Sequence, residues 1–123
     1  MSWTAYLAPL NGFAPDSAII SLQGAHCGHV GKWDSSQAEE MNYANLFKDL
    51  SSAQVKGLQY GGKKYIIIRA GDDVLIAQSG KEGIVMQKSG TVIVAAHFGE
   101  GSVAGSVASR IDLIVRQLVQ NGC

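Results

Sequence analysis

The glycines in the ten residues HFGEGSVAGS (97–106) have the spacing in this chain that most strongly suggests a ligand-binding loop. Gly99, Gly101 and Gly105 follow an apolar run, TVIVAA, and a glycine-rich turn between a strand and a helix can hold the phosphates of a nucleotide. Such a site also needs a parallel strand after the helix, but here the sequence ends with the helix. We therefore interpret these glycines as a turn that lets the last helix lie close to Ala95–Ala96.

Two further groups of residues could carry chemistry. The run HCGH contains His26, Cys27 and His29, which are all zinc-ligand types, but no fourth ligand stands at a recognisable spacing. We expect a surface loop there and no metal. Glu39 and Glu40 are neighbours on a predicted helix, so their carboxylates point in different directions and do not form an acid–base pair.

The last candidates for catalysis are a base and a nucleophile. His97 lies at the end of a predicted strand, where we expect a half-buried ring with a satisfied hydrogen bond. Cys27 would need a base held beside it, which a glycine-rich loop does not provide. The sequence therefore predicts a protein that is not an enzyme and has no cofactor.

The composition fits one folded domain covering residues 1–123, with 46% hydrophobic and 16% charged residues. The net charge is zero, with two basic and five acidic side chains in residues 1–50 and eight basic and five acidic ones in residues 51–123. This imbalance is too mild for a nucleic-acid-binding protein. We see no signal peptide, so we expect a cytoplasmic protein in which Cys27 and Cys123 are free thiols.

The first half of the chain is predicted to contain two helices and two strands. Ser2 can cap a short helix that should end or kink near Ala8, because Pro9 lacks a backbone donor. The runs SAIISL and HVGKWD are predicted strands, the second less regular than the first. Ser36 and Glu39 have the spacing of a capping box, which begins a helix over about residues 37–50.

The second half is predicted to be an antiparallel meander followed by a long helix. Its strands are separated by short turns and have the sequences VKGLQY, KKYIIIRA, VLIAQS, GIVMQKS and TVIVAAHF. We expect Tyr65–Ile68 and Val92–Ala96 to be covered on both faces. The helix spans Ser102–Asn121 and buries a stripe of apolar residues, Val103, Val107, Ile111, Ile114 and Leu118.

These elements define an α+β fold. It has a central antiparallel β-sheet with the N- and C-terminal helices packed on one face and a further helix on the other.

Three aromatic residues, Trp3, Tyr6 and Trp33, lie at positions where an aromatic side chain is not needed to fill the hydrophobic core. Rings with N–H or O–H donors at their edges form grooves for proline-rich peptides in the polyproline II conformation. We expect the three rings to converge into one such exposed groove.

At this point the sequence resembles the profilin family. The resemblance rests on MSWTAY, SAII, GLQYGGKKYIIIR, GKEGIVMQKSGTVIVAAHF and the C-terminal LVQNGC, in this order and over essentially the whole chain. It implies a small cytoplasmic protein of the cytoskeleton, monomeric, which binds actin monomers and regulates actin assembly and nucleotide exchange. It also implies binding to proline-rich proteins such as formins, and to phosphoinositides.

The resemblance carries over to particular residues. The proline-peptide groove would contain Trp3, Tyr6, Trp33, Gln117 and Cys123, with the last two at positions where the family has His, Tyr, another aromatic residue or Met. The actin surface would contain Val55, Lys64, Ile67, Arg69, Lys81, Glu82, Gly105, Ser109 and Arg110. Two alternatives remain open: a proline-peptide or trafficking adaptor without actin binding, and a small nucleotide-binding enzyme.

Overall fold

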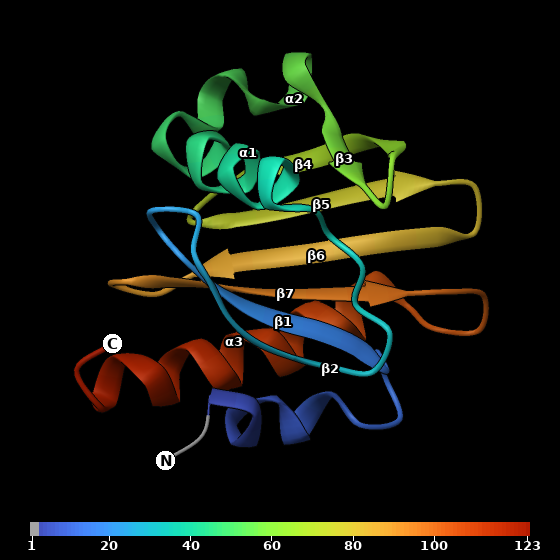
Figure 1. The fold of residues 1–123 in the computed structure, drawn as a ribbon. Coiled ribbons are helices and arrows are strands. Elements are labelled where there is room, and N and C mark those ends of the chain that lie inside the picture. Colours follow the sequence, from blue (N-terminus) through green and yellow to red (C-terminus); the bar gives the residue numbers. More distant parts are fainter. Residues whose placement is uncertain (1–2) are drawn as a thin grey trace.

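The computed structural model describes residues 3–123, which form a seven-stranded antiparallel sheet with the strand order β2-β1-β7-β6-β5-β4-β3 (Figure 1). No helix among these residues is long and apolar enough to cross a membrane. The elements are η1 (a 3-10 helix, Trp3–Leu10), β1 (Asp16–Ser21), β2 (His26–Val30), α1 (Gln37–Lys48), η2 (Leu50–Ser52), α2 (Ala53–Lys56), β3 (Leu58–Tyr60), β4 (Lys63–Gly71), β5 (Val74–Ser79), β6 (Glu82–Lys88), β7 (Val92–Phe98) and α3 (Ala104–Gln120).

The five C-terminal strands form the predicted meander, because each pairs with the next one along the chain. β1 then pairs with β7, and β2 lies outside β1 at the edge. Val92–Ala96 in β7 is buried on both faces, as predicted. β4 differs, since Ile66 and Ile68 are 69% and 52% exposed. The prediction that Tyr65–Ile68 is covered on both faces is wrong because α3 packs on β6 and β7 and leaves this part of the sheet open.

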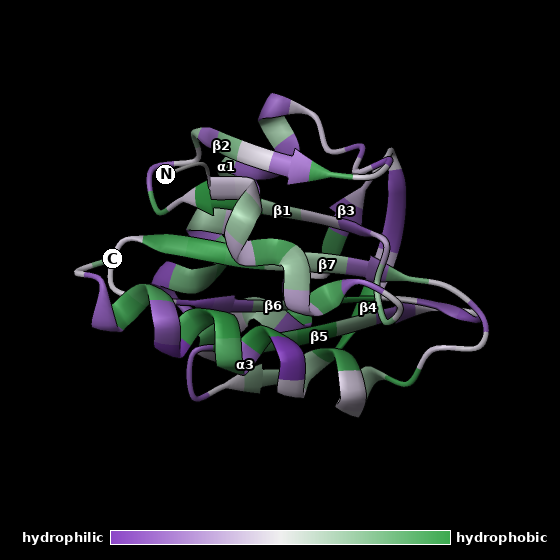
Figure 2. Ribbon diagram, turned by 90° about the horizontal axis from the view of Figure 1, so that it is seen from below, coloured by the Kyte–Doolittle hydropathy of each residue, from purple (hydrophilic) through white to green (hydrophobic). Residues whose placement is uncertain are grey.

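The helices divide between the two faces of the sheet as predicted (Figure 1). The α3-side core packs α3 and η1 against the sheet through Leu7, Leu10, Ile111, Ile114 and Leu118. The α1-side core lies on the other face and includes Tyr43, Leu46, Phe47, Tyr60 and Tyr65. Hydrophobic and hydrophilic bands alternate along α3 in Figure 2, which shows its amphipathic character.

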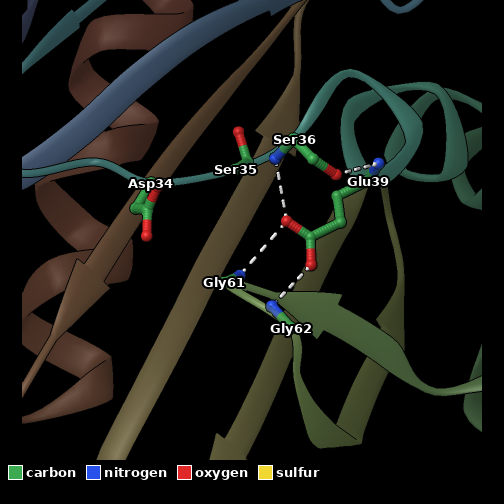
Figure 3. Close-up of a pocket in the computed structure, with 6 residues that line it drawn as sticks. All are labelled: Asp34, Ser35, Ser36, Glu39, Gly61 and Gly62. Atoms are coloured by element: carbon green, nitrogen blue, oxygen red, sulfur yellow. Dashed lines mark hydrogen bonds between the residues drawn. The ribbon is translucent and has the colours of Figure 1, made fainter.

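The start of α1 is fixed by the predicted capping box. The Ser36 hydroxyl accepts from the Glu39 backbone N–H at 3.1 Å, and the Glu39 carboxylate accepts from the Ser36 N–H at 2.9 Å. The same buried carboxylate also accepts from the backbone N–H groups of Gly61 and Gly62 in the β3–β4 turn (Figure 3). One side chain therefore caps the helix and ties it to a turn that is 22 residues away in the sequence.

The N-terminal helix runs past the predicted break. It is a 3-10 helix that continues to Leu10 and contains Pro9. The helix was expected to end or kink near Ala8, and it does not end there, because proline's fixed φ suits a 3-10 helix. Residues beyond Pro9 complete the hydrogen bonding, with Asn11 donating to the Ala8 carbonyl at 3.0 Å. The proposed cap, Ser2, lies outside the described residues.

Two boundaries in the middle of the chain also differ from the prediction. β2 begins at His26 and ends at Val30, whereas the sequence suggested a strand over HVGKWD, residues 29–34. The segment predicted as a strand from Val55 begins as the short helix α2. In both places the sequence is rich in glycine, and the first residue of the strand could not be predicted from it. Where a strand begins depends on pairing with the neighbouring strand rather than on local sequence.

The glycines after β7 form a turn, as predicted. Gly101 has a φ of 96°, a conformation that favours glycine. Gly105 was expected to allow a close approach of α3 to the sheet, but a Cβ placed there would meet no atom within 4 Å. That part of the prediction is wrong, because Gly105 lies on the exposed side of the helix.

Candidate functional site

Trp3 and Tyr6 lie side by side on η1 and form the first candidate surface. Their ring centroids are 6.4 Å apart with an interplanar angle of 44°, and both rings are half-buried against the α3-side core. The Asn121 side-chain amide donates to the Tyr6 hydroxyl at 3.1 Å. The two aromatic rings are therefore anchored beside the C-terminal end of α3 and remain partly open to solvent.

The C-terminal residues predicted for this surface lie close to it. Cys123 is half-buried against the same core, and its carbonyl accepts hydrogen bonds from the Thr91 N–H at 2.8 Å and the Ser89 hydroxyl at 2.9 Å. Gln117 is exposed on α3, one helical turn before Asn121, the residue that binds Tyr6. The two positions contribute a thiol and an amide, so the surface has no third aromatic ring from the C-terminus.

Trp33 does not join Trp3 and Tyr6. It is only 7% exposed and belongs to the α1-side core, on the other face of the sheet. Its ring centroid lies 4.6 Å from that of Tyr60, and its Nε1 donates to the Ser35 hydroxyl at 2.7 Å. The predicted convergence of all three rings is therefore not found, because Trp33 follows the end of β2 and turns into the core beneath α1.

The β2 residue that faces Trp3 is Gly28. A Cβ at this position would lie 3.5 Å from Trp3 Cβ and 3.4 Å from Thr4 Cγ2, which is ordinary contact. Gly28 pairs with Ile19, whose side chain lies in the α3-side core, so position 28 faces the same side as η1. Sequence reasoning missed this neighbour because a glycine carries no side chain to signal a binding surface.

A second candidate surface lies between β4, β5 and the start of α3. Arg69, Gly105 and Ser109, three of the residues predicted for one interface, line a single hollow there. The other lining residues are Val74, Ile76, Gln87, Ala108 and Asp112. The Gln87 side-chain amide donates to the Asp112 carboxylate at 3.0 Å and forms part of this hollow. The structure thus joins predicted residues that are 36 to 40 positions apart in the sequence.

The other uncharged residues predicted for this interface, and Lys64, differ in their exposure to solvent. Val55 is 89% exposed and Lys64 is also exposed. Ile67 is buried in the α1-side core and presents no surface, which corrects its assignment as a contact residue. Its neighbours Ile66 and Ile68 are the exposed ones, because side chains alternate between the two faces of the sheet along this part of β4.

The charged residues of the predicted interface have partners of their own. Lys81 pairs with Glu100 at 3.1 Å, and Arg110 lies over the Phe13 ring at 4.4 Å from its centroid. The Glu82 carboxylate accepts from Lys63 Nζ at 2.6 Å, and this hydrogen bond lowers the pKa of Glu82. Arg110 therefore turns toward the loop before β1 and away from the hollow.

The residues first considered for chemistry have structural partners. His97 is largely buried and lies 3.1 Å from a Glu82 carboxylate oxygen, the satisfied hydrogen bond that was predicted. Cys27 and Cys123 are free thiols, as predicted. Within residues 3–123, no group of three or more His, Cys, Asp or Glu residues is arranged to hold a metal ion.

These features define an α+β protein whose antiparallel sheet carries the N- and C-terminal helices packed together on one face. The family model for profilin matches residues 1–123. Profilin-A of Physarum polycephalum is 29% identical over 130 residues, with 99% of each chain covered. The crystal structure of Schizosaccharomyces pombe profilin superposes with a TM-score of 0.92 at 28% identity, covering 99% of this chain and all of the other. This chain belongs to the profilin family, whose members are non-enzymatic actin-binding proteins.

Two more distant structures share the fold and were solved with partners. Mouse profilin IIa, in complex with a double repeat from the FH1 domain of mDia1, has a TM-score of 0.78 at 19% identity over full coverage of both chains. LokiProfilin2, in complex with rabbit actin, has a TM-score of 0.82 at 17% identity and 98% coverage of each chain. At these identities the likeness shows the fold alone.

Proposed function

We propose that this chain binds monomeric actin and regulates actin assembly and nucleotide exchange. The observation that carries the proposal is the hollow that brings Arg69, Gly105 and Ser109 together, next to a part of the sheet that α3 leaves open. Ile66 lies on the same sheet face as Arg69, since their β5 partners Gln78 and Ile76 are two residues apart. An exposed apolar strand beside a cationic group suits a protein–protein interface with an acidic partner such as actin.

We also propose that Trp3 and Tyr6 bind proline-rich proteins such as formins. Two fixed aromatic rings offer a polyproline II helix flat faces, and the Tyr6 hydroxyl and the Trp3 indole N–H offer polar groups at the ring edges. Gly105 and Asn121 lie 16 residues apart along α3, which corresponds to roughly 24 Å at 1.5 Å per residue. The two surfaces are therefore far enough apart for actin and a peptide to bind together.

The remaining parts of the proposal follow from family membership. The chain would act as one monomeric domain in the cytoplasm, in association with the cytoskeleton. It would also bind phosphoinositides through basic side chains.

The specific test of the proposed actin binding is a pyrene-actin assembly assay. Slower assembly with increasing amounts of this chain supports monomer binding. Unchanged assembly, together with retained binding of proline decamer, would favour the adaptor alternative.

Arg69→Glu is expected to weaken actin binding about tenfold, which corresponds to about 1.4 kcal/mol. The charge reversal places a carboxylate in the hollow, near Asp112, and toward an acidic partner. The actin Kd is measured by the dependence of pyrene-actin assembly on the concentration of the variant. Lys48→Glu, at the end of α1 on the opposite layer, is the matched charge-reversal control and should leave this Kd unchanged. An unaltered Kd for Arg69→Glu would remove Arg69 from the interface.

Trp3→Ala is expected to weaken proline-decamer binding more than tenfold and to leave the actin Kd nearly intact. The reason is that the substitution removes one of the two rings of the aromatic surface while the hollow near α3's start is untouched. Isothermal titration calorimetry is the suitable measurement, because the variant lacks one of the two tryptophans that would report by fluorescence. Loss of both activities would mean that Trp3 serves folding instead.

A further inference from the structure

A β-bulge in β2 places two histidines on one face of the sheet. His29 pairs with Ala18, and His26 pairs with Ile20, with a register shift between Ile19 and Ile20 that leaves Cys27 as the extra residue. Ala18 and Ile20 both face the α1-side core, so their partners face that side too. Without the bulge, residues three apart on a strand would point to opposite faces.

The two imidazole rings approach each other closely at this position. His26 Nε2 lies 3.0 Å from His29 Nδ1, and the ring centroids are 5.1 Å apart. At this distance one ring nitrogen donates a hydrogen bond to the other. Zinc binds imidazole nitrogen at about 2.0–2.1 Å, so a cis pair of ligands has its nitrogens about 2.9 Å apart at a right angle and about 3.3 Å apart at the tetrahedral angle.

A carboxylate behind the pair fixes the orientation of the first ring. His26 Nδ1 lies 2.7 Å from a carboxylate oxygen of Glu40, which is only 3% exposed. The same oxygen accepts from the Ser35 hydroxyl at 2.7 Å. Because an ionised carboxylate can only accept, it holds the proton on Nδ1 and leaves Nε2 with a lone pair directed toward His29. This carboxylate–histidine arrangement is how proteins orient imidazoles that bind metals.

We propose that His26 and His29 form a two-histidine chelate for a divalent transition-metal ion such as Zn²⁺ or Cu²⁺, with Glu40 as the positioning residue. The ion would take the place of the proton between the two nitrogens, and water would fill its other coordination positions. Both histidines are accessible to solvent, so the ion can enter without any opening of the fold. The site lies on the opposite sheet face from Trp3 and Gly28 and is independent of the proposed actin and peptide surfaces.

The test is titration of the full chain with Zn²⁺ by isothermal titration calorimetry. We expect one saturable site, whose affinity falls at least tenfold in His29→Gln and about tenfold or more in Glu40→Gln. Cys27→Ser is the matched control within the same strand. Its thiol is half-buried against the α3-side core, on the other face, so the Zn²⁺ affinity should not change. Equal affinity in wild type and His29→Gln, no saturable heat, or a loss in Cys27→Ser would each overturn the proposal.

A second readout separates direct ligation from an effect on folding. The electron paramagnetic resonance spectrum of the chain with one equivalent of Cu²⁺ should show hyperfine coupling to two imidazole nitrogens. In His29→Gln the coupling should fall to one nitrogen, while circular dichroism without metal stays the same. Two-nitrogen coupling retained in His29→Gln would contradict the assignment.

Discussion

At the scale of single residues, Glu39 shows how one buried group can organise two distant parts of the chain. Its Oε1 accepts from the N–H groups of Ser36 and Gly61, and its Oε2 accepts from that of Gly62 (Figure 3). All three donors are backbone groups that would otherwise need water. The buried glutamate is therefore part of the scaffold that joins α1 to the β3–β4 turn.

Glu39→Gln is expected to destabilise the fold by about 1–3 kcal/mol. The amide can replace only one of the two oxygens, and its NH₂ group would face a backbone N–H that then has no acceptor. Urea unfolding followed by circular dichroism measures the change. Glu100→Gln is the control, since Glu100 pairs with Lys81 on the exposed surface and should contribute less than about 1 kcal/mol. Equal losses in the two variants would contradict this role for Glu39.

At the scale of elements, local signals in the sequence predicted much of the fold. The Ser36–Glu39 spacing and the short turns of the meander depend on neighbouring residues, and both predictions are confirmed. The apolar stripe of α3 is confirmed from Val107 to Leu118, but the helix begins at Ala104 and leaves Val103, its N-cap residue, 67% exposed. The course of β2 and the position of Trp33 depend on a bulge and on a distant ring, Tyr60, so no local pattern could reveal them. Likewise, Ile67 needed the true register of β4 before its burial could be known.

The position of Gly28 in β2 leads to a prediction about the aromatic surface formed by Trp3 and Tyr6. Gly28→Trp should strengthen proline-decamer binding by roughly fivefold, because a ring beside Trp3 adds a stacking face worth about 1 kcal/mol. The backbone at Gly28 has no positive φ, and a Cβ there meets only ordinary contacts. Calorimetric titration with proline decamer measures the affinity. Trp33→Phe, which alters the ring in the other core, should leave that affinity unchanged, and a loss there would place Trp33 in the peptide site after all.

At the scale of the whole molecule, the two cores differ in chemistry. Tyr43, Tyr60 and Tyr65 are buried in the α1-side core, whereas the α3-side core, within residues 3–123, has only Tyr6 half-buried against it. Burial raises the pKa of each of the three phenols, and it raises that of Tyr60 to about 12. The α1-side core therefore carries three phenols that resist ionisation at alkaline pH.

The raised pKa of Tyr60 predicts that the free energy of unfolding falls as the pH rises from about 10 to about 12. The unfolded chain releases phenol protons near pH 10, whereas the folded chain keeps that of Tyr60 until about pH 12, so rising pH favours unfolding across this interval. Urea unfolding at a series of pH values measures the decline. Tyr60→Phe is expected to make the decline shallower, although it also removes the hydrogen bond from the Asp34 N–H and lowers stability at neutral pH. A slope that is the same in both proteins would contradict the assignment.

The two margins of the sheet have a consequence for behaviour in crowded solution. β3 has only three residues, and β2 is interrupted by its bulge. Short or irregular outer strands are poor templates for a second polypeptide to add itself by backbone hydrogen bonding. We therefore expect the protein to resist fibril growth even at high concentration, although its interior strands are rich in isoleucine and valine.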